Sequence, residues 1–171
     1  MRALGATAAE SGYEMGILRA VEAANDYQKT KLFSYINQYF KGKTFAVWGL
    51  AFKPHTEDMR EAPSRTLLEA LWQAGARVKA YDPKAMGEAR RLCPRQTDLQ
   101  LCKTRDEVLE GADGLVICTE WQHFRASNFE QILRSLKSTV IFDGRNLSEP
   151  QMLKQMGINY FGIGRGDSVT H

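Results

Sequence analysis

The apolar positions of the chain fall into six short runs, at residues 44–49, 77–82, 99–102, 115–119, 139–144 and 159–163, of which the third is the weakest. Short continuous apolar runs are typical of strands that are buried on both faces of a parallel sheet. The segments between them carry helical spacing, at residues 64–74, 84–92, 106–111, 129–136 and 149–156. This alternation predicts an α/β fold, namely a Rossmann-like doubly wound parallel sheet of about six strands.

One long helix is expected before the first strand. Apolar residues keep helical spacing from Leu18 to Tyr39, Ser11 can cap a helix that begins near Tyr13, and Gly42 would end it. Such a helix would span roughly 40 Å at 1.5 Å per residue.

The middle of this helix, residues 23–31 ("AANDYQKTK"), is polar where the apolar stripe would continue. The helix therefore either spans two packing environments or serves as a connector between domains or as a dimer-forming element. On this basis we divide the chain into a long connecting or dimerisation helix, residues 1–42, and an α/β domain, residues 43–171.

Composition excludes several classes of protein. The 23 basic and 20 acidic residues give a net charge of +3, which is too mild to predict binding to nucleic acid. No apolar stretch approaches the roughly 18 residues of a membrane helix, and the N-terminus has no apolar signal-peptide core. We expect a cytoplasmic protein with no membrane association.

The cysteines are Cys93, Cys102 and Cys118, an odd number without paired spacing. This pattern argues against disulfides and against a metal site. Cys118 lies inside an apolar run, so we expect it to be a small buried side chain and not a reactive thiol.

The candidate chemistry lies at the ends of the expected strands, because doubly wound sheets bind ligands beyond the carboxyl ends of their strands. The first strand is followed by "GLAFKPHTEDMREAP", which has one glycine and carries Lys53 and Arg60. Arg145, in "DGRN", follows the fifth strand. Converging cations favour an anion such as phosphate. Three acidic residues of the first turn are expected to hold the cations through ion pairs: Glu57, Asp58 and Glu61. The alternative is a solvated loop of mixed charge.

Two other polar residues, Asp82 and His123, give weaker evidence of a functional role. Asp82 follows the second strand, where dinucleotide-binding folds place the acid that binds the cofactor ribose, but that role requires a glycine-rich turn after the first strand. We therefore interpret "YDP" as a turn that ends the strand, and expect no standard NAD site in this sheet. His123 has no second histidine nearby and is interpreted as a surface residue.

Four motifs together resemble one enzyme family. "GLAFKPHTEDMREAPS", "YDP", "ICTEW" and "IFDGRN" occur in the order and at the spacing of the UDP-glucose 6-dehydrogenases, and the resemblance runs from about Tyr13 to Arg165. It implies NAD-dependent oxidation of UDP-glucose, or a related UDP-sugar, to the uronate in two hydride transfers. It also implies a homodimer formed through the long helix, with residues 1–42 as the end of a central helical region and residues 43–171 as a C-terminal UDP-sugar-binding domain.

The resemblance assigns roles to four residues. By match to the motifs, Phe52 and Lys53 would contact the nucleotide-sugar, Arg145 would reach it from the fifth strand, and Arg60 would extend toward NAD. The family's "GxGYVG" cofactor turn and "GGxCFPKD" cysteine segment do not occur in this sequence. We therefore assign no catalytic residue and expect a fragment that is inactive alone, with NAD bound mainly by an absent domain.

Two alternatives to this interpretation stay open. The chain could be a non-catalytic module for nucleotide-sugar binding or dimerisation. It could also be an unrelated Rossmann-like enzyme such as a methyltransferase, although the first turn lacks the glycine-rich pattern that such an enzyme would carry.

Overall fold

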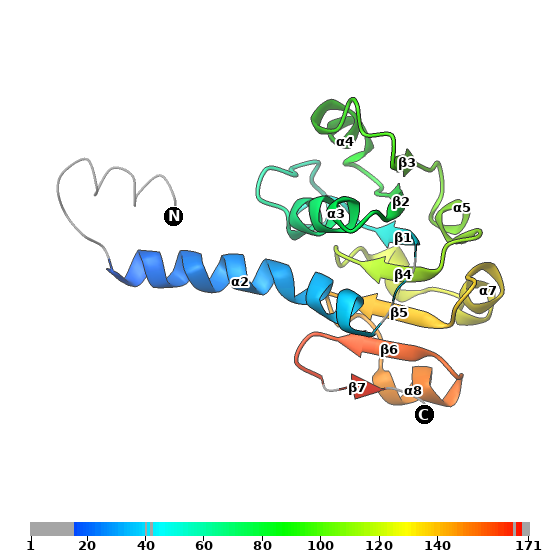
Figure 1. Ribbon diagram of the computed structural model, residues 1–171. Helices are drawn as coiled ribbons and strands as arrows, with labels where there is room; N and C mark the ends of the chain where they lie inside the picture. Colours follow the sequence, from blue (N-terminus) through cyan, green and yellow to red (C-terminus); the bar gives the residue numbers. More distant parts are fainter. Residues whose placement is uncertain (1–15, 40, 42, 166, 169–171) are drawn as a thin grey trace.

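The computed structural model describes residues 16–39, 41, 43–165 and 167–168 (Figure 1). These residues form a seven-stranded sheet in the order β3-β2-β1-β4-β5-β6-β7. The strands are β1 Thr44–Trp48, β2 Arg77–Tyr81, β3 Leu99–Leu101, β4 Gly114–Ile117, β5 Val140–Asp143, β6 Asn159–Gly162 and β7 Asp167–Ser168. β1 to β6 are parallel, which confirms the predicted sheet. β7 is an addition, a two-residue strand that pairs antiparallel with β6.

The helices of the described residues are α2 Gly16–Tyr39, α3 Pro63–Gln73, α4 Met86–Leu92, α5 Arg105–Leu109, α6 Gln122–Arg125, α7 Phe129–Ser135 and α8 Pro150–Gln155. The expected helices between the strands are therefore present. The four-residue helix α6 was not predicted, because a single turn is too short to show helical spacing.

The strands are buried on both faces, as their continuous apolar runs required. Successive side chains of a strand point to opposite sides. Phe45 and Val47 of β1 accordingly pack into one core cluster together with Leu71 of α3, whereas Ala46 and Trp48 pack into a second cluster. The second cluster is completed by residues of α5, α6, α7 and α8.

The two halves of α2 have different surroundings. Leu32 and Ile36, in its C-terminal half, are buried in the first core cluster. Ile17 and Tyr27 remain 82% and 66% exposed, and Figure 1 shows the N-terminal half projecting away from the sheet. The expected cap, Ser11, and the expected end at Gly42 lie outside the described residues, and the division into residues 1–42 and 43–171 stays a prediction. Among the described helices, none is long and apolar enough to cross a membrane.

Candidate functional site

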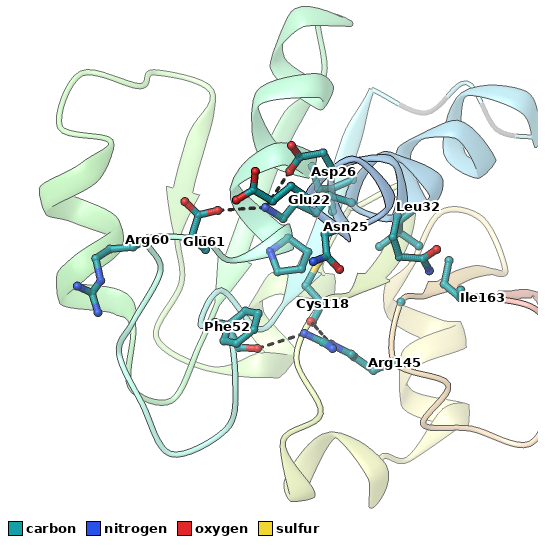
Figure 2. A pocket seen from close by; sticks show the side chains of 15 residues that line it. Glu22, Asn25, Asp26, Leu32, Phe52, Arg60, Glu61, Cys118, Arg145 and Ile163 are labelled. Carbon is teal, nitrogen blue, oxygen red and sulfur yellow. Dashed lines mark hydrogen bonds and ion pairs between the residues drawn. The ribbon is translucent and has the colours of Figure 1, made fainter. Parts of the chain in front are cut away.

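The carboxyl ends of the parallel strands border a cavity of about 850 Å³, a volume typical of small-molecule sites. On the sheet side it is lined by residues that follow four different strands: Phe52 after β1, Cys118 after β4, Arg145 after β5 and Ile163 after β6 (Figure 2). The strand order reverses between β1 and β4. The cavity therefore lies where a doubly wound sheet is expected to hold its ligand.

The turn after β1 is held by hydrogen bonds to the side chain of Asp82, which follows β2. Its buried carboxylate accepts hydrogen bonds from the backbone N–H groups of Leu50 and Ala51, at 2.7 and 3.1 Å. It also accepts from Trp121 Nε1 at 3.2 Å and from the N–H groups of Lys84 and Ala85. Because these donors occupy both oxygens, Asp82 is not free to bind a cofactor ribose. The expected turn at the end of β2 is confirmed, and Asp82 in addition holds the turn after β1.

The one glycine of this turn is required by close packing. Gly49 has a φ of +87°, and a Cβ built there would lie 2.5 Å from Thr119 Cβ. Only glycine adopts this conformation at no steric cost. The Thr119 hydroxyl in turn donates to the carbonyl of Ala51 at 2.6 Å. The glycine thus serves the contact between the ends of β1 and β4.

Arg145 is held against the floor of the cavity by backbone carbonyls. Its Nε donates to the carbonyl of Cys118 at 2.8 Å, and its Nη2 donates to the carbonyl of Phe52 at 3.1 Å. The Glu120 carboxylate lies 3.1 Å from Nε as an ion-pair partner. Nη1 makes no hydrogen bond to a described residue, so this part of the planar guanidinium can take an anion from the cavity.

The backbone around Arg145 is fixed by a second buried carboxylate, Asp143. Its Oδ1 accepts from the N–H of Arg145 at 2.9 Å, and its Oδ2 accepts from the N–H of Leu147 at 2.7 Å. The Tyr160 hydroxyl donates to the same Oδ2 at 2.9 Å. Burial and the neighbouring Asp143 raise the pKa of Tyr160 well above its usual range, so that this donor keeps its proton.

Asn146 completes this turn in a left-handed conformation, with a φ of +54°. Asparagine tolerates that conformation better than most residues. Its Nδ2 donates to the carbonyl of Ile163 at 2.9 Å, which links the end of β5 to the end of β6. A Cβ on Gly162 would lie 2.7 Å from Asn146 Oδ1, so the glycine leaves room for this side chain.

The four residues assigned from sequence are only partly brought together. Phe52, Arg60 and Arg145 all line the cavity. Arg60, whose side chain is 81% exposed, lies apart from Arg145 (Figure 2). Lys53 is exposed, with Nζ 5.4 Å from the centre of the Phe52 ring, and is not a lining residue of the cavity. The assignment of Phe52, Lys53 and Arg145 to substrate, and of Arg60 to cofactor, stays a prediction.

The acidic residues of the first turn behave differently from one another. Asp58 pairs with Arg60 as expected, its two oxygens accepting from Nε at 3.1 Å and from Nη2 at 2.8 Å. The hydrogen bonds from Arg60 lower the pKa of Asp58 to about 2. Glu61, by contrast, lies 3.1 Å from Lys29 Nζ and so ties the turn to α2.

The expectation for Cys118 is confirmed, and the expectation for His123 is wrong. Cys118 is buried, and burial raises the pKa of its thiol to about 12, as expected of a side chain that is not a nucleophile. His123 is not a surface residue: it lies half-buried in α6, its ring centre 4.4 Å from that of Phe124, and burial lowers its pKa. The error arose because α6 was not predicted.

Within the described ranges, no cluster of three or more histidine, cysteine or acidic side chains could hold a metal ion.

Sequence reasoning missed the second wall of the cavity, which α2 provides. Its lining residues are Glu22, Asn25, Asp26, Gln28, Lys29 and Leu32. The signal was present in the sequence as the polar interruption of the apolar stripe at residues 23–31, but nothing local showed what that polar surface faces.

A parallel sheet with helices on both faces, and an arginine-bearing cavity at its strand switch point, defines a Rossmann-like ligand-binding domain. The chain belongs to the UDP-glucose/GDP-mannose dehydrogenase family, since residues 46–150 match the model of the family's UDP binding domain.

Known relatives agree with this membership. The chain is 44% identical over 172 residues to a UDP-glucose 6-dehydrogenase of Pseudomonas aeruginosa and 36% identical over 169 residues to one of Rhizobium meliloti. Each comparison covers 96% of this chain and 38% of the relative, so the chain spans a little over a third of the length of these proteins. Its structure is similar to that of a UDP-glucose dehydrogenase of Pyrobaculum islandicum, with a TM-score of 0.72 and 28% identity, over 85% of this chain and 32% of that one.

Proposed function

We propose that the chain binds UDP-glucose or a related UDP-sugar in the cavity, as the nucleotide-sugar-binding part of an NAD-dependent UDP-glucose 6-dehydrogenase. The enzyme would oxidise UDP-glucose to UDP-glucuronate. The observation that carries the proposal is the Arg145 guanidinium, which two backbone carbonyls fix at the floor of the cavity with Nη1 left unpaired among the described residues. A fixed arginine at the carboxyl end of a central strand suits a diphosphate.

Phe52 and Lys53 would assist at the mouth of the cavity. Phe52 is 40% exposed and its carbonyl accepts from Arg145, so its ring offers a flat apolar surface to a base or a sugar. The exposed ammonium of Lys53, held near this ring, can reach a phosphate from the solvent side.

The turn after β1 does not fit NAD, because it has one glycine and Asp82 is fully engaged with backbone donors. We propose that NAD is held mainly by residues outside this chain, with the exposed Arg60 extending toward it. Chemistry on the sugar then depends on groups that this chain does not supply, so the chain alone is expected to be inactive.

A homodimer formed through α2 is part of the proposal. Ile17 and Tyr27 are large apolar side chains left exposed on the projecting half of the helix, and exposed apolar surface of this kind favours an interface. Sedimentation equilibrium at tens of micromolar is expected to show a dimer, and a monomer at that concentration would contradict this element of the proposal.

Calorimetric titration with UDP, UDP-glucose and NAD tests the function. UDP and UDP-glucose are expected to bind, whereas NAD alone is expected to give no binding heat. NADH absorbance should not rise when the chain is mixed with UDP-glucose and NAD. Binding of NAD without UDP-glucose binding, or NADH formation by a pure preparation, would contradict the proposal.

A further inference from the structure

The polar interruption of α2 faces the cavity. Residues 23–31 break an apolar stripe that resumes at Leu32, which is buried. A helix that packed on the sheet along its whole length would keep an apolar face throughout. Here the stripe becomes polar over the stretch where α2 borders the cavity. The polar lining residues from α2 are Glu22, Asn25, Asp26, Gln28 and Lys29, and Leu32 also lines it (Figure 2). The polar residues of this stretch therefore form a wall of the cavity that can face a ligand.

Part of this wall is already engaged within the protein. Lys29 Nζ lies 3.4 Å from Asp26 Oδ1 and 3.1 Å from Glu61 Oε2, and its side chain is only 19% exposed. These three residues form an ion-pair bridge between α2 and the turn after β1. The bridge ties α2 to the turn after β1 at the edge of the cavity.

The remaining polar groups of the wall have unused capacity to accept hydrogen bonds. Glu22 Oε1 is buried and has no hydrogen-bond partner among the described residues, an arrangement that native structures rarely leave unexplained. The side-chain amides of Asn25 and Gln28 also make no hydrogen bond to a described residue. A carboxylate accepts but does not donate, so its natural complement in a ligand is a hydroxyl or an N–H group.

We infer that α2 forms the hydroxyl-binding wall of the site, where Glu22 and Asn25 accept hydrogen bonds from hydroxyl groups of the nucleotide-sugar. The inference rests on the proposed function. Electrostatics sets the orientation of the ligand: the diphosphate is attracted to Arg145 on the sheet side and repelled by the Glu22 carboxylate, so the neutral, hydroxyl-rich part of the ligand lies against α2. Ribose and hexose both carry such hydroxyls, and the experiment below separates them.

The test is calorimetric titration of the full chain and its variants with UDP-glucose, UDP and inorganic pyrophosphate. Glu22→Ala is expected to weaken UDP-glucose binding about tenfold, and Asn25→Ala about threefold. Asn37→Ala is the matched control, because this exposed asparagine of α2 is not a lining residue of the cavity. Pyrophosphate has no alcohol groups, so Glu22→Ala should leave its binding unchanged or slightly tighten it, while Arg145→Ala should weaken it.

Loss with UDP-glucose alone places the contact on the hexose, and equal loss with UDP places it on the ribose; both outcomes support the inference. Binding of UDP-glucose by Glu22→Ala and Asn25→Ala within about twofold of the unmodified chain would overturn it. So would a uniform change for all three ligands, which would show that Glu22 acts only through charge or folding. Glu22→Met, of similar length but without an acceptor oxygen, replaces Glu22→Ala if circular dichroism shows that the alanine variant has lost helix.

A different set of results would contradict the proposed function itself. If the unmodified chain binds neither UDP nor UDP-glucose, or if Arg145→Ala does not weaken pyrophosphate binding, the function is wrong and the hydroxyl-binding wall is wrong with it. If the unmodified chain binds and Arg145→Ala matters while the α2 variants bind normally, only the role of α2 is wrong.

Discussion

The turns after β1 and after β5 each bring an arginine to the same cavity, but they are built differently. In the turn after β1, Asp82 holds only the base, at Leu50 and Ala51, and the chain beyond it carries Arg60 on an exposed segment. In the turn after β5, Asp143 accepts a hydrogen bond from the backbone N–H of Arg145 itself. Asp58 accepts in the same way from the N–H of Arg60, at 3.0 Å, but its side chain is 39% exposed. The second turn therefore fixes its cation to a buried carboxylate, whereas the first fixes its cation only to another residue of the same surface loop.

The side chains repeat this contrast. The Arg145 side chain is 28% exposed and is held by carbonyls of two other segments. The Arg60 side chain is 81% exposed, and its partner Asp58 belongs to the same loop. Exposed ion pairs contribute little energy, whereas a group fixed in its binding geometry loses less entropy when the ligand binds. We therefore expect Arg145 to anchor the phosphates and Arg60 to adapt to a second partner.

The largest effect is expected from removing the two buried carboxylates that hold these turns. Asp82→Ala leaves five hydrogen-bond donors without their acceptor and should lower the free energy of unfolding by about 3 kcal/mol. Asp143→Ala leaves three such donors and should cost about 2 kcal/mol. Urea denaturation followed by circular dichroism measures both. A loss below about 1 kcal/mol for Asp82→Ala would show that the turn after β1 does not depend on this carboxylate.

A smaller change in the free energy of unfolding should distinguish the two residues that adopt a left-handed backbone conformation in these turns. Asn146 (φ +54°) makes a hydrogen bond across to β6, whereas His55 (φ +64°) is exposed in the first turn. Asn146→Ala should cost about 2 kcal/mol, from backbone strain and the lost bond, and Asn146→Gly about 1 kcal/mol, from the lost bond alone. His55→Gly is the control and should change the free energy of unfolding by less than about 0.5 kcal/mol. Equal costs for Asn146→Gly and His55→Gly would remove the distinction between the turns.

The smallest effect concerns the pH dependence of the first turn. Hydrogen bonds from Arg60 lower the pKa of Asp58 to about 2. A depressed carboxylate pKa contributes stability above its unfolded-state value and loses it as the pH falls through the folded value. Because the pair lies at the surface, where solvent screens it, we expect it to open near pH 2 with little change in the free energy of unfolding. Side-chain carboxyl chemical shifts should give this midpoint, and Arg60→Ala should move it toward about 3.9; an unmoved midpoint would mean that Arg60 is not the cause.

Sequence reasoning could find the sheet and the ligand edge because both depend on local signals. Buried parallel strands appear as apolar runs, and parallel topology brings residues at separate strand ends together. This is how Arg60 and Arg145 were expected at one edge of the sheet, where both line the cavity. The pairing of Asp58 with Arg60, two residues apart, was accessible for the same reason.

What sequence reasoning missed depends on contacts between distant segments. Asp82 binds backbone groups 31 and 32 residues away, and no local pattern announces such a partner. The half-burial of His123 follows from α6, a helix of only one turn, and β7 has only two residues. Elements this short leave no periodic pattern in the sequence. The polar stretch of α2 was visible, but its role depends on a cavity that exists only after the helix has packed on the sheet.

The measurement that tests this account most directly is calorimetric titration of UDP into the Arg145→Ala and Arg60→Ala variants, with Lys53→Ala beside them. We expect Arg145→Ala to weaken UDP binding about ten- to a hundredfold, because it removes a charge-assisted contact of roughly 1.5–3 kcal/mol. Lys53→Ala should weaken it less, Arg60→Ala should stay within about threefold of the unmodified chain, and added salt should weaken binding throughout. Loss of UDP binding in Arg60→Ala, with normal binding in Arg145→Ala, would contradict the assignment of the two turns.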